Sequence, residues 1–124
     1  MKAFLIDPFT RTITEVEYDG SLEHMYQLIG CDSVEAVKLT DSGDCVWVDE
    51  EGLLKNPTHF FYIGNYPGEL AGKGLVLGTD GGGNTVPCAT ITLPLLLRSV
   101  AYMNMQKGEY VAPPIIVTLM DKAL

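Results

Sequence analysis

Short apolar runs and alternating apolar and polar residues, interrupted by turn-forming residues, account for most of the first 92 positions. This pattern predicts strands, because successive side chains of a strand point to opposite faces of a sheet. We expect strands at residues 2–7, 12–18, 34–39, 45–49, 59–63, 75–77 and about 85–92. The first two flank a turn at Pro8, so we expect them to form a hairpin.

A short helix is predicted between the second and third strands. Ser21 is a favourable N-cap, and Gly30 is the kind of residue that commonly ends a helix. Between them, four apolar residues recur at helical spacing: Leu22, Met25, Tyr26 and Ile29. A helix of this length is marginal alone, so we expect its apolar stripe to pack on the sheet.

A second helix, apolar on nearly every side, is predicted over residues 93–105, with Thr92 as its N-cap. Residues 110–120 are expected to be extended and, because they contain Pro113 and Pro114, to lie at an edge. The predicted fold class is α+β, an antiparallel or mixed β-sheet with a short N-terminal helix and an apolar C-terminal helix packed on it. A chain of 124 residues predicts a single domain, 1–124.

The composition is that of a globular protein, with 47% hydrophobic and 19% charged residues. No apolar run reaches the ~20 residues of a membrane span, and the first residues lack the apolar stretch of a secretory signal. These features predict a cytoplasmic protein with no membrane partner. The three cysteines, Cys31, Cys45 and Cys88, include no CxxC pair, which favours reduced, buried thiols over disulfides or a zinc site.

The net charge of −8 is concentrated in the first half of the chain, where residues 1–62 carry 12 acidic and 4 basic side chains. An acidic surface repels phosphate backbones, so we expect no direct nucleic-acid binding. The acids form either a solvated surface or a docking face for a basic host protein, in the manner of a nucleic-acid mimic. The candidate docking residues are Glu15, Glu17, Glu35, Asp49, Glu50 and Glu51.

The second half is electrically balanced and contains the most glycine-rich segment, residues 79–85. Its simplest interpretation is a loop between two strands, and the alternative is a flap over a ligand. It lacks the Lys-Ser/Thr pair of a P-loop. If the ligand is a small nucleotide, cationic groups and backbone donors must hold it. The candidates for that role are Lys73, Asp80, Gly81, Gly82, Gly83 and Arg98.

No catalytic residue, metal ligand or cofactor is predicted. His24 and His59 lack the spacing of a metal site, and Asp41, Asp44 and Asp49 do not follow the spacing of a calcium loop. We expect replacement of both histidines by Gln to leave structure and activity intact. A Cys–His nucleophile pair remains an alternative, although no family signature surrounds these cysteines and histidines.

Five segments, in this order, resemble a family of small uncharacterised proteins of phages, plasmids and other mobile elements, which is catalogued as a domain of unknown function. They are Ser21-Leu22-Glu23-His24-Met25-Tyr26-Gln27-Leu28-Ile29-Gly30, Val34-Glu35-Ala36-Val37, Val46-Trp47-Val48-Asp49-Glu50-Glu51-Gly52-Leu53-Leu54, Phe60-Phe61-Tyr62-Ile63-Gly64 and Leu70-Ala71-Gly72-Lys73-Gly74. The resemblance covers about residues 1–80. It implies an accessory protein of a phage or mobile element and brings no catalytic residues with it.

The leading hypothesis is therefore a non-enzymatic, anti-defence protein that binds a host protein or a small signalling nucleotide. The alternatives are a structural or regulatory subunit without a ligand and a small enzyme. We also expect a homodimer formed through residues 93–105 and 111–120, in which case Val100→Glu or Ala101→Glu would separate the protomers. The alternative is that residues 93–105 lie at the centre of the monomer.

Overall fold

Strands are the main regular elements in the computed structural model, which describes residues 1–64, 66–114 and 119. The strands are β1 (Lys2–Asp7), β2 (Thr12–Glu17), β3 (Val34–Lys38), β4 (Cys45–Asp49), β5 (His59–Ile63), β6 (Leu70–Ala71), β7 (Gly74–Thr79), β8 (Thr85–Val86), β9 (Val100–Asn104) and β10 (Glu109–Val111). The helices are short: α1 (Leu22–Ile29), α2 (Leu93–Leu97) and the 3-10 turn η1 (Gly52–Leu54).

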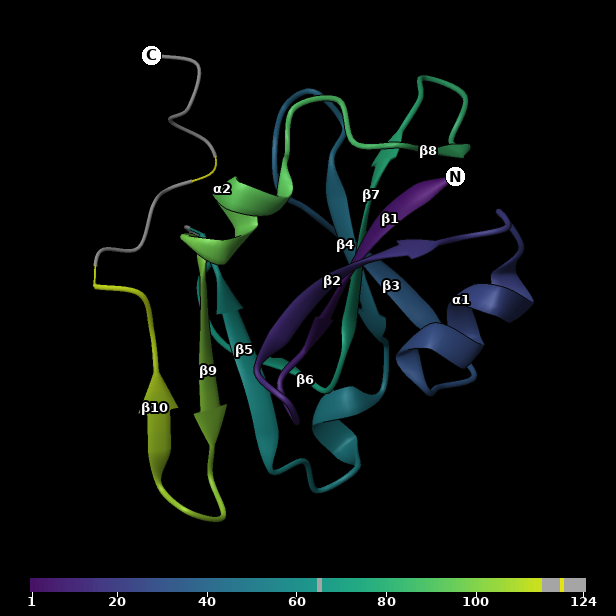
Figure 1. The fold of residues 1–124 in the computed structure, drawn as a ribbon. Coiled ribbons are helices and arrows are strands. Elements are labelled where there is room, and N and C mark those ends of the chain that lie inside the picture. The colour runs from purple at the N-terminus through teal and green to yellow at the C-terminus, as the bar shows by residue number, and fades with distance from the viewer. Residues whose placement is uncertain (65, 115–118, 120–124) are drawn as a thin grey trace.

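These strands form two antiparallel sheets that face each other (Figure 1). The large sheet has the order β2-β1-β7-β4-β3, and β8 pairs with the end of β7. The small sheet has the order β10-β9-β5-β6. The predicted β1–β2 hairpin is confirmed, with Ile6 opposite Ile13.

The main core lies between the two sheets. The large sheet contributes Phe4, Ile6, Val46 and Val76, and the small sheet contributes Phe61, Ile63 and Val100. All seven side chains are at most 9% exposed. One end of this core is covered by α2, through Leu95 and Leu96.

The outer face of the large sheet is covered by α1. Met25 and Ile29 pack with Ala3, Leu75 and Leu77 of the sheet in a second apolar cluster. Leu22, the first member of the predicted stripe, is instead 54% exposed. The predicted helix is confirmed, but Leu22, at its N-terminal end, does not belong to the buried face.

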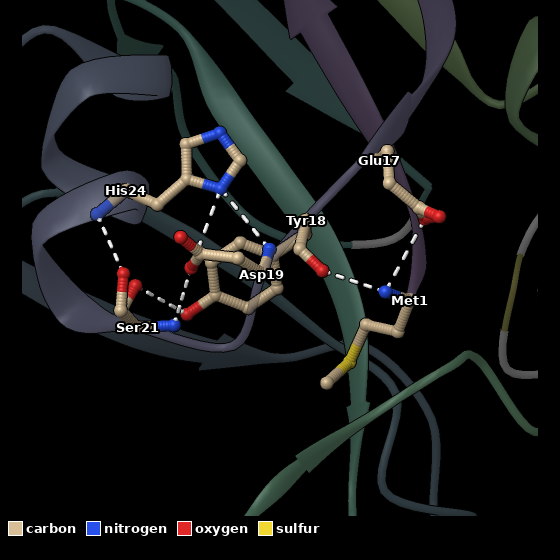
Figure 2. Close-up of polar contacts among 6 residues, drawn as sticks. All are labelled: Met1, Glu17, Tyr18, Asp19, Ser21 and His24. Carbon is tan, nitrogen blue, oxygen red and sulfur yellow. Dashed lines mark hydrogen bonds and ion pairs between the residues drawn. The ribbon is translucent and has the colours of Figure 1, made fainter.

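The start of α1 is fixed by a small polar cluster (Figure 2). The Ser21 hydroxyl accepts a hydrogen bond from the His24 backbone N–H at 3.1 Å, and Gly30 ends the helix with a φ of 83°. The Asp19 backbone N–H donates to His24 Nδ1 at 3.1 Å, and the His24 ring stacks on Tyr18. The Met1 amino group donates to the Tyr18 carbonyl at 2.6 Å. His24 thus holds the strand-to-helix connection in place.

The predicted α+β class is wrong, because the described chain is mostly β and its helices are minor. The second predicted helix extends only to Leu97, and residues 100–104 form β9. The Ser99 hydroxyl donates to the Leu95 carbonyl at 2.6 Å, which helps to close α2. Beyond it, Val100 and Tyr102 alternate inward and pair with β5, and this long-range pairing overrides the local apolar pattern.

Two other extended predictions differ in length. The strand predicted over residues 85–92 is limited to β8, and an irregular segment follows it. Of the segment predicted over residues 110–120, Tyr110 and Val111 lie in β10, while residues 115–118 and 120 lie outside the described residues.

Candidate ligand-binding site

The core between the sheets becomes polar toward one end. Along β5 the inward side chains run from Ile63 through Phe61 to His59, and along β9 they run from Val100 through Tyr102 to Asn104. His59 lies opposite Asn104, and Tyr102 lies opposite Phe61. The β1–β2 and β9–β10 turns lie at this same end, at the bottom of Figure 1.

A cavity of about 230 Å³ opens between these elements. We call it the polar cavity. The side chains that give it its character are Arg11, His59, Tyr102, Asn104, Lys107 and Glu109. Phe9 and Val111 are among its apolar lining residues. It therefore draws polar groups from the large-sheet hairpin on one side and from the small sheet on the other.

Two Asx-type turns hold the backbone on either side of this cavity. Asp7 Oδ1 accepts from the backbone N–H groups of Phe9 at 2.9 Å and Thr10 at 3.4 Å, and Arg11 follows with a positive φ of 57°. Asn104 Oδ1 accepts from the N–H groups of Gln106 at 3.0 Å and Lys107 at 3.3 Å. Each turn thus places one basic residue at the cavity.

His59 is held in a defined orientation. The Thr58 hydroxyl and His59 Nδ1 are 2.8 Å apart, within hydrogen-bonding distance. The His59 ring packs on Phe9 with 4.5 Å between ring centroids and an interplanar angle of 31°. The Met105 N–H donates to the Thr58 carbonyl at 2.8 Å, which ties the β9–β10 turn to this pair.

Tyr102 supplies a neutral donor. Burial, reinforced by the negative charge of Asp7, raises the pKa of Tyr102 from its ordinary value of 10 to about 12. A tyrosine is protonated at neutral pH already at its ordinary pKa, and the raised pKa extends this to more alkaline pH, so its O–H can donate to an anion.

A second cavity of about 390 Å³ lies on the other side of the Phe9–His59 stack, and both rings line it as well. We call it the rear cavity. Its apolar lining includes Ile29, Pro57 and Ala71, and its polar lining includes Asn56 and Thr58. Among the described residues, the non-glycine residues with positive φ are Arg11 and Asn56, one at each cavity. Such backbone strain is frequently found at binding sites.

Basic residues are concentrated around these cavities. Four of the chain's eight lysines and arginines line them: Arg11, Lys55, Lys73 and Lys107. Lys55 Nζ lies 2.7 Å from Asp49, and Lys73 Nζ lies 4.0 Å from Asp7. Within residues 1–64, 66–114 and 119, no ion pair involves Arg11 or Lys107. Of the four basic residues that line the two cavities, the two without an ion pair in this part of the chain both belong to the polar cavity.

The structure does not bring the predicted acidic docking residues together. Glu15 and Glu17 lie on β2, at one edge of the large sheet, and Glu35 lies on β3, at the opposite edge. Asp49, Glu50 and Glu51 follow at the end of β4, where Asp49 is ion-paired and only 11% of its side chain is exposed. Because β3 pairs with β4, Glu35 lies beside the second group, while two strands, β1 and β7, separate Glu15 and Glu17 from it.

The residues predicted to hold a nucleotide are also dispersed. Lys73 precedes β7 and Asp80 follows it, so about 20 Å separates them at 3.3 Å per residue. Arg98 is exposed at the end of α2. Lys73 is the member of the predicted set that lines one of the two cavities described above.

The glycine-rich segment joins β7 to β8 in a hairpin (Figure 1). Asp80 Oδ1 accepts from the N–H groups of Gly82 at 2.8 Å and Asn84 at 2.9 Å. These bonds and that from the Asn84 side chain lower the pKa of Asp80. Gly81 and Gly83 have open space where a Cβ would lie. The prediction of a loop between two strands is confirmed.

Sequence reasoning missed Asp44, which was interpreted as part of a solvated turn. Its side chain is fully buried and accepts hydrogen bonds from residues 89–91. It also missed most residues of the polar cavity. These residues could have been found from the alternating positions 59, 61 and 63 and 100, 102 and 104, which become polar at one end. The prediction of a helix over 93–105 concealed this alternation.

Neither a metal-binding cluster nor a membrane-spanning helix is found among the described residues. No group of three or more His, Cys, Asp or Glu side chains is arranged to hold a metal ion there. None of the helices in that part of the chain is long and apolar enough to cross a membrane.

The sequence was then compared with known proteins. Residues 1–93 match the model of a family described as a domain of unknown function, DUF3846. The chain belongs to the DUF3846 family. The family match includes β1 to β8 and stops at Leu93, so the β9–β10 hairpin lies beyond it. The polar cavity therefore combines Phe9, Arg11 and His59 from the family region with residues outside it.

A curated relative is the uncharacterized protein y4iR of Sinorhizobium fredii, which is 36% identical over 81 residues. The match covers 64% of this chain and 50% of the relative, so the chain spans about half the length of that protein. No solved structure matches the chain.

Proposed function

We propose that this DUF3846 protein binds a small, phosphate-bearing ligand in the polar cavity. The observation that carries the proposal is the convergence of Arg11 and Lys107, without carboxylate partners among the described residues, in one cavity of a chain with a net charge of −8. Of the hypotheses drawn from the sequence, this supports the small-nucleotide branch over a ligand-free subunit.

The cavity has the donors that a phosphate group requires. A guanidinium can bind two phosphate oxygens at once, and an ammonium adds a compact positive charge. The Tyr102 hydroxyl, which is neutral at physiological pH, and the Asn104 amide also line the cavity. Glu109 offsets one of the two positive charges, so the cavity keeps a net positive charge for a phosphate group.

The proposal is tested by calorimetric titration of pyrophosphate and of a panel of nucleotides. We expect wild-type protein to bind and the double variant Arg11→Ala/Lys107→Ala to lose at least about tenfold in affinity, because each charged hydrogen bond contributes about 1.5–3 kcal/mol. The matched control is Lys38→Ala/Arg98→Ala, which removes the same charge from exposed positions outside the cavity. Equal losses in both variants, or no binding by wild-type protein, would reject the proposal.

A second candidate is docking on a basic host protein through the end of β4 and η1. Leu53 and Leu54 are 61% and 80% exposed and directly follow Glu50 and Glu51. This candidate predicts binding that weakens steeply with added salt and is lost in Leu53→Ser/Leu54→Ser. Binding that survives these changes would exclude it.

A small enzyme is the third candidate, since His59 and Glu109 are two titratable groups in one cavity. Phosphorus NMR of the bound ligand distinguishes binding from turnover, because hydrolysis changes the phosphate resonances with time. The phage or mobile-element origin, the anti-defence role, the cytoplasmic location and the homodimer stay predictions on which this proposal does not depend.

A further inference from the structure

We infer that the phosphate-bearing ligand is a nucleotide that spans both cavities, with its phosphate in the polar cavity and its base in the rear cavity, across the Phe9–His59 stack. This inference rests on the proposed function and adds the class and the orientation of the ligand.

The distribution of charge sets the orientation. In the polar cavity, Arg11 and Lys107 face only Glu109 as a carboxylate, which leaves a positive balance even when His59 is neutral. In the rear cavity, Lys55 is neutralised by Asp49 at 2.7 Å, and Lys73 lies 4.0 Å from Asp7. A phosphate therefore gains more in the polar cavity, and an uncharged group loses less in the rear cavity.

The lining of the rear cavity suits a planar heterocycle. Ile29, Pro57 and Ala71 give it apolar walls, while the Asn56 amide offers both a donor and an acceptor. An adenine or guanine has the same combination of apolar faces and polar edges. A lipid tail cannot form hydrogen bonds with the polar lining residues, and a sugar without a base has too little apolar surface to pack against the apolar ones.

The aromatic pair stands at the boundary between the cavities. Phe9 is 56% exposed, although its ring packs against His59, so one aromatic surface remains open to a ligand. Stacking on such a surface is a common way of holding a base. The size also fits a spanning ligand. Ligand sites usually measure roughly 300–1,000 Å³. The 230 Å³ polar cavity alone falls below this range, so a ligand held there gains room by extending into the 390 Å³ rear cavity, with which it shares Phe9 and His59.

The test compares pyrophosphate, ribose 5-phosphate and the matching nucleotides, AMP and GMP, by calorimetry on wild-type protein and on Phe9→Ala. We expect at least one nucleotide to bind about fivefold or more tightly than ribose 5-phosphate to wild-type protein, and Phe9→Ala to remove that advantage, so that the two compounds bind the variant with similar affinity. Tyr110→Ala is the matched control, because Tyr110 is an aromatic residue of similar exposure, 54%, that lies on β10 of the small sheet and does not line either cavity.

A second variant tests the base end of the site. Asn56→Gly keeps the positive φ of 51° and removes the amide, so it should reduce the preference between AMP and GMP. If pyrophosphate binds but nucleotides bind no more tightly than ribose 5-phosphate and Phe9→Ala has no effect, the inference is overturned and the proposed function stands. If no phosphate compound binds wild-type protein, both fail.

Discussion

Asp44 lies at the start of β4 and is fully buried, and its carboxylate accepts four hydrogen bonds. Oδ1 accepts from the Ala89 N–H at 2.7 Å, and Oδ2 accepts from the Thr90 N–H at 2.9 Å, the Thr90 hydroxyl at 3.0 Å and the Ile91 N–H at 2.9 Å. These residues belong to the irregular segment that connects β8 to α2. A single side chain therefore supplies the acceptors that a strand ladder would otherwise provide.

Replacing Asp44 by Ala should destabilise the protein strongly, because three backbone N–H groups would lose their acceptor. At about 1–3 kcal/mol for each buried, unsatisfied group, we expect a loss of at least about 3 kcal/mol in the free energy of unfolding. Urea denaturation followed by circular dichroism measures it. Asp41→Ala is the control, since Asp41 is 85% exposed, and it should leave the midpoint unchanged. Equal midpoints for the two variants would show that Asp44 is not a structural anchor.

The thiol of Cys88 makes stability depend on alkaline pH. Burial, with a smaller contribution from the charge of Asp44, raises the pKa of Cys88 from 9.0 to about 12. Below pH 9 both the folded and the unfolded chain keep this proton. Between pH 9 and 12 the unfolded chain releases it first, so stability falls as pH rises. Tyr102 acts in the same direction from pH 10 upward.

We therefore expect the thermal unfolding midpoint to decline above pH 9, and Cys88→Ala to make the decline between pH 9 and 10 shallower. Midpoints measured below pH 8 provide the baseline for each protein. An identical pH dependence in wild type and variant would contradict the assignment of a buried, protonated thiol.

At the scale of elements, α1 is held by only part of its apolar surface. Met25 is 2% exposed and packs against the large sheet, whereas Leu22, on the same helix, is 54% exposed. We expect Met25→Ala to cost about 2–5 kcal/mol in chemical denaturation and Leu22→Ala to cost much less. If the two substitutions had equal effects, the orientation of α1 described here would be wrong.

The placement of β9 changes the result expected for Val100→Glu and Ala101→Glu, which the sequence predicted to separate a dimer. Val100 and Ala101 are 2% and 0% exposed within one chain, so a charge at either position meets the core rather than a partner protomer. Val100→Glu should unfold the protein, because it buries an unpaired carboxylate. Loss of the folded circular dichroism spectrum would confirm this. A folded Val100→Glu variant would show that β9 is misplaced.

Local patterns predicted most of the elements. Six of the seven strands from β1 to β7, and α1, follow from alternation, turn residues and caps, and each was placed within about three residues of its position. The two-residue strand β6 was not predicted. Residues 93–105 failed because their near-continuous apolar character fits a helix and a buried strand equally well. The pairing of β9 with β5, about 40 residues away, decides between them, and the sequence does not show that pairing.

The candidate site was less predictable for the same reason. Arg11, His59 and Lys107 come from three separate turns or strand ends, and only the sheet topology brings them to one cavity. Glycine content and charge runs directed attention instead to residues 80–83 and to the acids of β2, β3 and β4. Neither signal contains information about which strand ends meet.

At the scale of the whole molecule, the homodimer remains a prediction. It was based on an apolar helix over residues 93–105, where the structure has the short helix α2 and the strand β9. The described apolar residues that are exposed in the C-terminal part are Leu97, Met105, Tyr110 and Val111, at 41–62%. If a dimer forms through α2, Leu97→Glu should separate it without unfolding the chain, since Leu97 is 53% exposed. Light scattering at micromolar concentration decides: a mass near 13.5 kDa for wild-type protein would exclude the dimer.

We place ligand binding at the end of the two sheets where the β1–β2 and β9–β10 turns lie, and not at the glycine-rich hairpin at the opposite end (Figure 1). Backbone amide chemical shifts, followed by NMR during titration with AMP, test this most directly because they report on every region at once. We expect shifts confined to the segments that line the two cavities, residues 8–11, 29–30, 49–59, 71–73 and 102–111. Shifts centred on residues 80–84, or none at saturating AMP and pyrophosphate, would contradict it.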